Sequence, residues 1–134
     1  MVSQENVEIV RRWYERAHSA RMYPDPAFLS PDLVYRPVAN FTESGTYRGL
    51  GEFRGFLESF YEAWADDFTI TATSVRDYGD AVIARVQFSG HARASGVVSP
   101  WRAFSVFWLR DGLITRVEDY ADRAEALKAV GLEE

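Results

Sequence analysis

The stretch Trp108-Leu109-Arg110-Asp111-Gly112-Leu113-Ile114-Thr115-Arg116-Val117-Glu118-Asp119-Tyr120-Ala121-Asp122 contains the features that decide the fold. An apolar segment reaches Asp111-Gly112, and a second alternating segment follows. Asp-Gly between two such segments predicts a β-hairpin, because glycine accepts the positive φ that tight hairpin turns need. Glu118 and Asp119 lie where the second segment ends. A carboxylate on the inner face of a curved sheet can act as a general base or bind a ligand.

The chain has 134 residues, which predicts a single domain over residues 1–134. A hydrophobic content of 47% and an aromatic content of 15% are sufficient for a packed core. The net charge of −5 and the scattered arginines argue against a nucleic-acid surface, which needs clustered Lys and Arg. With no cysteine, and with His18 and His91 far apart, we expect no metal site and no cofactor.

The N-terminal residues are polar and acidic, and they lack the basic and apolar regions of a signal peptide. No later stretch approaches the roughly 20 apolar residues of a membrane span. The sequence therefore predicts a cytoplasmic protein with no membrane partner.

Capping residues predict the ends of the helices. Ser3 can cap a first helix, and Asp25-Pro26 can open a short second helix that Ser30-Pro31-Asp32 ends. A third helix is expected at about residues 50–65, with one strongly aromatic face. Asp122 predicts the cap of a closing helix, with Glu125 in the capping-box position and Gly131 as its stop.

Five segments have the composition of strands: 33–38, 68–78, 81–93, 97–109 and 113–121. Residues 37–51 are expected to form a loop across the mouth of a pocket. Helices followed by an antiparallel meander predict an α+β fold, with helices packed on one face of a curved sheet.

The order of these elements and several local strings resemble the SnoaL-like group of the nuclear transport factor 2-like superfamily. The matching strings are residues 5–12, 45–49, 111–120, 122–127 and 131–132, so the resemblance covers nearly the whole chain. It implies a cone-shaped fold: a curved antiparallel or mixed sheet, N-terminal helices on its concave face and a short C-terminal helix. It names no reaction, because this superfamily carries isomerases, hydrolases, cyclases, dehydratases and non-enzymatic domains.

Position by position, the chain departs from the ketosteroid isomerase-like members. Trp13 lies at about the position of their helical tyrosine, with Tyr14 next to it, and Arg36 or Pro37 lies at the position of their catalytic base. Neither Arg nor Pro can abstract a proton, so the resemblance argues against that isomerisation.

Limonene-1,2-epoxide hydrolase-like members match better. Arg85 and Asp119 fall at the positions of their Arg and last-strand Asp, and Tyr35 at that of their Tyr. Gln87 replaces their second Asp, the acid that protonates the leaving oxygen, which argues against epoxide hydrolysis. The resemblance to cyclase-like members offers Asp119 as an acid–base residue.

Strand alternation gives independent support for a pocket. If Asp119 points inward, so do Val117 and Thr115, while Arg116, Glu118 and Tyr120 point away. On the strand expected at residues 81–93, Arg85 and Gln87 share one face, and we expect that face to be the inner one. The predicted pocket lining adds side chains from the first strand and the helices to these: Tyr35, Trp13, Tyr14, Phe56, Phe60 and Trp64.

Two interpretations of the charged pair remain open. Arg85 and Asp119 can be a buried structural ion pair, or a pair in a pocket where Asp119 is the acid–base residue and Arg85 orients it. The first function class is a domain that binds a small apolar or hydroxylated organic molecule. The second is an enzyme of the cyclase, isomerase or epoxide hydrolase type that works without a cofactor.

Apolar residues on the opposite side of the sheet predict a homodimer. The set Val86, Phe88, Phe104 and Trp108 is too apolar to face water over adjacent strands, so we expect a second copy of the chain to cover it.

Overall fold

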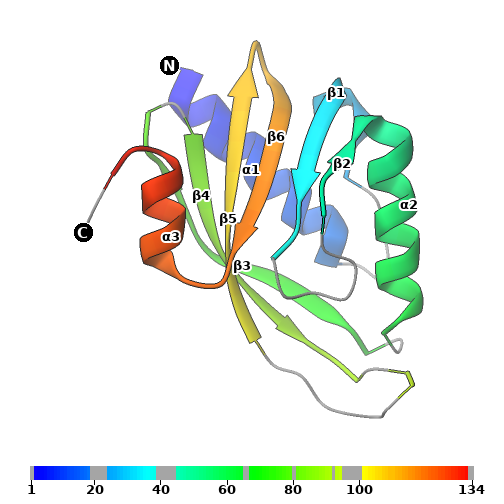
Figure 1. The fold of residues 1–134 in the computed structure, drawn as a ribbon. Coiled ribbons are helices and arrows are strands. Elements are labelled where there is room, and N and C mark those ends of the chain that lie inside the picture. The colour runs from blue at the N-terminus through cyan, green and yellow to red at the C-terminus, as the bar shows by residue number, and fades with distance from the viewer. Residues whose placement is uncertain are drawn as a thin grey trace.

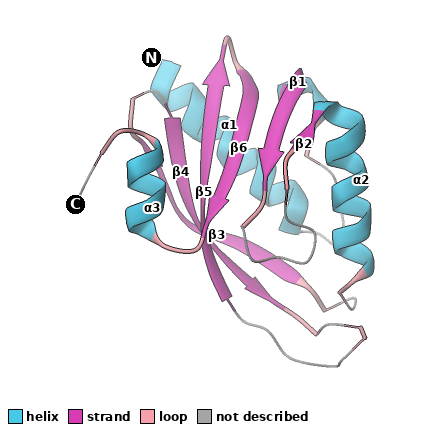
Figure 2. Cartoon of the chain, viewed as in Figure 1, coloured by secondary structure: helices cyan, strands magenta, loops and turns pink. Residues whose placement is uncertain are grey.

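The computed structural model describes residues 2–18, 24–38, 45–64, 67–79, 81–91, 93–94 and 101–132. The elements in these ranges are helices, one 3-10 turn and strands (Figures 1 and 2): α1 (Val2–His18), the 3-10 turn (Pro26–Phe28), β1 (Leu29–Arg36), β2 (Tyr47–Arg48), α2 (Gly49–Glu62), β3 (Thr69–Asp77), β4 (Ala81–Ser89), β5 (Trp101–Arg110), β6 (Leu113–Tyr120) and α3 (Arg123–Ala129). This is the expected α+β fold.

The strands form one six-stranded sheet in the order β2-β1-β6-β5-β4-β3. All neighbouring strands are antiparallel except β1 and β6, so the sheet is mixed. Helices α1 and α2 pack on one face, here called the inner face, and α3 crosses the other, the outer face (Figure 1). The main core therefore lies between the inner face and the first two helices.

The Asp111-Gly112 turn joins β5 to β6 as predicted. Asp111 has φ 52° and Gly112 has φ 78°, and positive φ at both positions is the geometry of a two-residue hairpin turn that matches strand twist. Leu109 pairs with Ile114, but Trp108 pairs with Arg116, so Thr115 is an extra residue on β6. This β-bulge shifts all later pairing on β6 by one residue.

The bulge corrects one predicted orientation. Thr115 was expected to share the inner face with Val117 and Asp119, but Ile114 takes that place in the core, 1% exposed. The Thr115 hydroxyl instead donates to the main-chain oxygen of Trp108, 3.1 Å away.

The predicted orientation of β4 is wrong. Val82, Ala84 and Val86 are fully buried on the inner face, whereas Arg85 and Gln87 are exposed on the outer face. The reason is that α1 and α2 cover the inner face. Of the two faces of β4, the one that carries only apolar side chains (Val82, Ala84 and Val86) is therefore the one that turns inward. Arg85 and Gln87 can reach water only on the outer face.

The remaining differences concern the ends of elements. β1 begins at Leu29, so Ser30-Pro31-Asp32 lies within a strand and does not end a longer helix. β2 lies inside the segment expected to be a loop, and α1 begins at Val2, one residue before its expected cap. The cap of α3 is confirmed: the Asp122 side chain accepts from the main-chain N–H of Glu125 at 2.9 Å.

Candidate functional site

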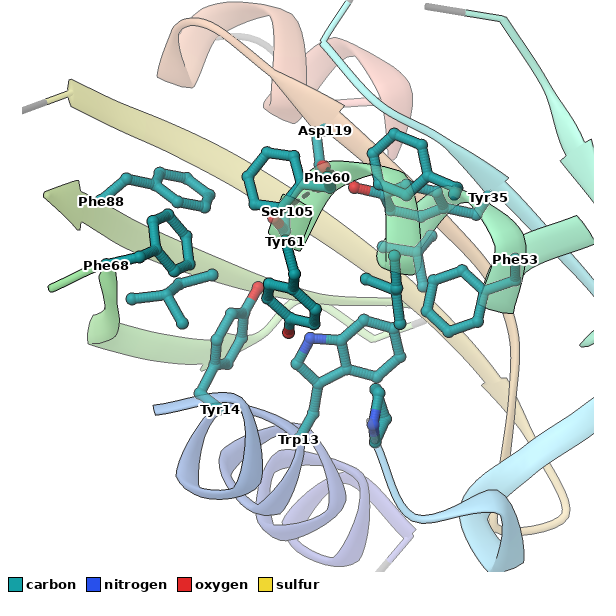
Figure 3. Close-up of a pocket in the computed structure, with 15 residues that line it drawn as sticks. Trp13, Tyr14, Tyr35, Phe53, Phe60, Tyr61, Phe68, Phe88, Ser105 and Asp119 are labelled. Carbon is teal, nitrogen blue, oxygen red and sulfur yellow. Dashed lines mark hydrogen bonds between the residues drawn. The ribbon is translucent and has the colours of Figure 1, made fainter. Parts of the chain in front are cut away.

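A cavity of about 60 Å³ lies between the inner face of the sheet and helices α1 and α2 (Figure 3). Most of its lining is aromatic, and the lining residues that the structure describes include one carboxylate, that of Asp119. The residues are Trp13, Tyr14, Pro24, Tyr35, Phe53, Phe56, Leu57, Phe60, Tyr61, Phe68, Ile70, Phe88, Ser105, Val117 and Asp119.

Two hydroxyl groups from neighbouring strands bind the carboxylate of Asp119. The Tyr35 hydroxyl donates to Oδ2 at 2.5 Å, and the Ser105 hydroxyl donates to Oδ1 at 2.6 Å. The sheet positions both donors, because Ser105 on β5 is paired with Asp119 and Tyr35 on β1 is paired with the adjacent inner-face residue, Val117. One carboxylate oxygen is thus held from each side of β6.

Helix α1 extends this network. Ser105 is also the hydrogen-bond partner of the Tyr14 side chain. This contact lowers the pKa of the Tyr14 phenol, although burial and the charge of Asp119 outweigh it. Three hydroxyl groups, those of Tyr14, Ser105 and Tyr35, therefore lie around the carboxylate of Asp119.

Burial sets the acidity of these groups. Loss of water raises the pKa of Asp119 from its ordinary 3.8 to about 6, against the opposing effect of the hydrogen bonds from Ser105 and Tyr35. Burial and the nearby charge of Asp119 hold the pKa of Tyr14 and Tyr35 well above the ordinary tyrosine value. At neutral pH the site therefore contains one carboxylate among neutral phenols.

Ring contacts stabilise the wall of the cavity. Trp13 from α1 meets Phe107 edge-on with ring centres 5.1 Å apart, and Tyr35 contacts Phe56 of α2 at 5.0 Å. In another part of the wall Phe60 meets Phe68 edge-on, with ring centres 5.4 Å apart. Such edge and tilted arrangements are favourable beyond the area they bury, so these side chains form a wall with defined positions.

The structure brings seven of the predicted site residues together around the cavity: Trp13, Tyr14, Tyr35, Phe56, Phe60, Val117 and Asp119. Trp64 is buried beside the cavity, with its ring 5.6 Å from that of Phe68.

Arg85 and Gln87 lie on the other side of the sheet, and the expected pairing of Arg85 with Asp119 is wrong. Arg85 borders a separate surface hollow with Arg76, Arg123 and Tyr78, next to α3. The reason is the orientation of β4 described above: strand alternation puts Arg85 opposite to the inner-facing Ala84 and Val86.

Sequence reasoning missed Ser105, Tyr61, Phe68 and Phe88 as members of the site. Tyr61 belongs to the aromatic face expected for the third helix, so that face was the available signal. Ser105 had no comparable signal, because a regular two-residue hairpin would pair it with Glu118, and only the bulge at Thr115 places it opposite Asp119.

In the described part of the chain, no three His, Cys, Asp or Glu side chains are grouped as a metal site would require. Nor does any helix in those same ranges have the length and apolar content needed to cross a membrane.

The chain belongs to the SnoaL-like domain family, whose profile matches residues 10–117. No curated protein sequence matches it.

Solved structures share the fold. An NTF2-like protein from Burkholderia thailandensis is 26% identical, with a TM-score of 0.74 over 87% of this chain and 90% of that one. A putative SnoaL-like polyketide cyclase from Jannaschia is 19% identical, with a TM-score of 0.75 over 97% and 91%. A hypothetical protein with a ketosteroid isomerase-like fold from Catenulispora acidiphila, in complex with trimethylamine, is 19% identical, with a TM-score of 0.71 over 93% of each chain.

Proposed function

We propose that this SnoaL-like domain binds a small apolar or hydroxylated organic molecule in the cavity, with Asp119 as the polar group that orients it. The observation that carries the proposal is a titratable carboxylate, held by two hydroxyl donors, at the wall of a mostly aromatic cavity. Concave apolar sites with few convergent polar groups are the usual form of a small-molecule site. The trimethylamine in the Catenulispora protein supports the use of this fold for small ligands.

A second candidate function is acid–base catalysis by Asp119. A pKa of about 6 suits a group that takes up and returns a proton near neutral pH. Tyr35 and Ser105 would orient the carboxylate, the part first assigned to Arg85. Asp119 is the one carboxyl group among the described lining residues, so the chemistry it supports is proton transfer at one atom, as in an isomerisation or cyclisation.

Ligand-observed NMR tests the binding proposal. The probes are neutral alcohols and ketones of roughly four to six non-hydrogen atoms, a size set by the cavity of about 60 Å³. We expect binding by the parent protein that weakens at least about tenfold in Asp119→Asn, which keeps the shape but removes the charge and one acceptor. Asp111→Asn is the matched control, because it makes the same change in an exposed turn whose positive φ asparagine tolerates. Absence of any cavity-dependent binding would refute the proposal.

The homodimer stays a prediction, but only two of the four apolar residues on which it was based lie on the outer face. Of the four residues behind it, Val86 and Phe88 face the inner core, while Phe104 and Trp108 are half-buried beside α3 on the outer face. A dimer would therefore form on the outer face around those two aromatic residues. Light scattering coupled to size exclusion measures the mass; a monomer at micromolar concentration contradicts the prediction.

A further inference from the structure

The negative charge of Asp119 has no positive partner among the described lining residues, so a neutral occupant would leave that charge uncompensated. Asp119 is ionised at neutral pH, and its pKa is governed by burial, Ser105 and Tyr35, with no positive group among these influences. None of the described lining residues is Lys, Arg or His. A negative charge in a sheltered site is costly unless a positive charge compensates it.

The walls favour a positive charge as well. Trp13, Tyr14, Tyr35, Phe60 and Phe68 surround the space in front of the carboxylate (Figure 3). Aromatic rings carry partial negative charge on their faces and attract ammonium groups, and cages of such rings are the usual recognition site for methylated amines. An anionic occupant would meet repulsion from the carboxylate.

We propose that the cavity binds a small organic cation, an alkylammonium group whose charge lies against Asp119 and whose alkyl groups contact the aromatic rings. The inference rests on the proposed function, since it names the ligand class of that same cavity. The volume of about 60 Å³ limits the bound group. Because one water site takes about 10–15 Å³ measured in this way, the bound group has roughly four to six non-hydrogen atoms.

Asp119 can accept this ligand without losing its present partners. Tyr35 occupies one lone pair of Oδ2 and Ser105 one of Oδ1, and a carboxylate has about four such sites. A protonated amine can donate to a remaining site, and a quaternary ammonium can lie in van der Waals contact. The hydroxyl network thus fixes the carboxylate in place before the cation binds.

The pH dependence has a definite sign. Apart from Asp119, the titratable groups on the described lining are the phenols of Tyr14 from α1, Tyr35 from β1 and Tyr61 from α2. Since the pKa of Asp119 is about 6, a cation should bind more weakly below pH 6, where the carboxyl group becomes neutral. A neutral ligand should lose less affinity there, because it has no charge to pair with the carboxylate.

Tetramethylammonium and tert-butyl alcohol form a matched pair of probes, since both are compact tetrahedral molecules with five non-hydrogen atoms and differ in charge. Each is titrated into the purified chain by ligand-observed NMR at pH 7.5 and pH 5. We expect the cation to bind at least about tenfold more tightly than the alcohol at pH 7.5, because its charge pairs with Asp119 in addition to its cation–π contacts. This advantage should shrink at pH 5 and in Asp119→Asn, where only the cation–π contacts remain, with Asp111→Asn behaving as the parent protein.

Other outcomes separate the two proposals. Equal or tighter binding of the alcohol, at both pH values, overturns the cation inference and leaves small-molecule binding in the cavity intact. Cation binding that Asp119→Asn does not weaken also overturns it, because the charge would then act elsewhere. If neither probe binds and the neutral probe set gives no hit, both proposals fail. Thermal melts of each variant show that the folded chain is being compared.

Discussion

The acidity of Asp119 is a balance between two opposed effects at one residue. Burial raises its pKa, while each donated hydrogen bond stabilises the charged form and lowers it. Ser105 and Tyr35 therefore keep the group ionised at neutral pH although it is sheltered from water. Their role is to hold and tune the carboxylate, and either donor can be removed singly.

Replacing one donor should move this balance. In Tyr35→Phe the ring remains but the hydroxyl is lost, so we expect the pKa of Asp119 to rise above about 6. The size should be about one unit, which matches one hydrogen bond to a charged group. Titration of the ¹³C carboxyl signal by NMR measures it. Tyr120→Phe removes the same group on the outer face, where it contacts Glu118, and should leave Asp119 unchanged. An unmoved pKa in Tyr35→Phe would contradict the hydrogen-bond network.

Asp119 and Tyr35 could be identified from the sequence, but Ser105 could not. An acid near the end of a clear hairpin strand is visible in a single sequence, and a resemblance pointed to the tyrosine. The partner of Asp119 across the hairpin depends on one extra residue in β6, Thr115. No local pattern predicts such a bulge, because it is stabilised by contacts that form only in the folded sheet.

At the scale of elements, β4 shows why alternation alone can mislead. Its first residues, Ala81-Val82-Ile83-Ala84, are buried on both faces, since α3 covers part of the outer face. Apolarity on both faces leaves the orientation of the strand undetermined. Arg85 and Gln87 decide the orientation of β4, because their side chains reach water only on the outer face. This requirement for solvation outweighs the resemblance, which placed Arg85 beside Asp119.

Gly90 connects β4 to the cavity wall. A Cβ at this position would lie 2.9 Å from Cα of Phe68, whose ring lines the cavity, so Gly90→Ala must displace backbone. We expect a loss of about 1–3 kcal/mol in the free energy of unfolding, typical of overpacking. Urea denaturation measures it. Gly55→Ala in α2 is the control, because a Cβ there would have no neighbour within 4 Å. Alanine is favoured over glycine within a helix, so this variant should raise the free energy of unfolding by about 0.5–1 kcal/mol. Equal stability of the two variants would contradict the close packing of Gly90 on Phe68.

On the outer face, Glu118 joins two strands electrostatically. It is 4% exposed and pairs with Arg36 of β1 at 3.2 Å and with Arg116 of β6, and the Tyr120 hydroxyl also donates to it. Burial alone would raise the pKa of Glu118, but the hydrogen bonds from Tyr120 and Arg116, together with the charges of Arg116 and Arg36, outweigh it and lower the pKa. Its stabilising effect is thus present above the ordinary glutamate pKa and is lost as pH falls through the lowered one.

Glu118→Gln should therefore destabilise the fold at pH 7 by about 1–3 kcal/mol, because charge-assisted hydrogen bonds are weakened and the arginines lose their partner. The effect should shrink toward pH 3. Glu58→Gln, in an exposed pair with Arg54 at 3.9 Å, should change the free energy of unfolding by less than about 0.5 kcal/mol. Chemical denaturation at several pH values compares the variants. A loss that is the same at every pH would point to shape and not to charge.

At the scale of the whole molecule, the sequence predicted the architecture more completely than the cavity. The order of helices and strands, the hairpin at Asp111-Gly112 and the cap at Asp122 follow from local signals that do not depend on distant contacts. The cavity depends on which face of each strand meets α1 and α2, and on the register between β5 and β6. Both are set by packing between segments far apart in the chain.

Asp119 also links the cavity to the stability of the whole molecule. Its pKa is about 6 in the fold against an ordinary 3.8, so the folded state binds the proton more tightly than the unfolded chain does. Ionisation of Asp119 therefore lowers stability as pH rises from about 4 to 6, by up to about 3 kcal/mol for a shift of this size. The lowered pKa of Asp67 and Glu118 acts in the opposite direction, so the parent protein alone does not isolate the effect.

The difference between Asp119→Asn and the parent protein isolates it. Asparagine cannot ionise, so the free energy of unfolding of this variant, relative to the parent, should increase between pH 4 and pH 6.5 and then stay constant. At pH 4 the variant should be the less stable of the two by about 1 kcal/mol, because its amide replaces one oxygen that accepts a hydrogen bond. Urea denaturation at half-unit pH steps measures the difference, and Asp111→Asn in the exposed turn should give a difference close to zero throughout. A flat difference for Asp119→Asn would mean that the carboxylate is as well solvated in the fold as in the unfolded chain, and the charge that the cavity offers a ligand would then be screened by water.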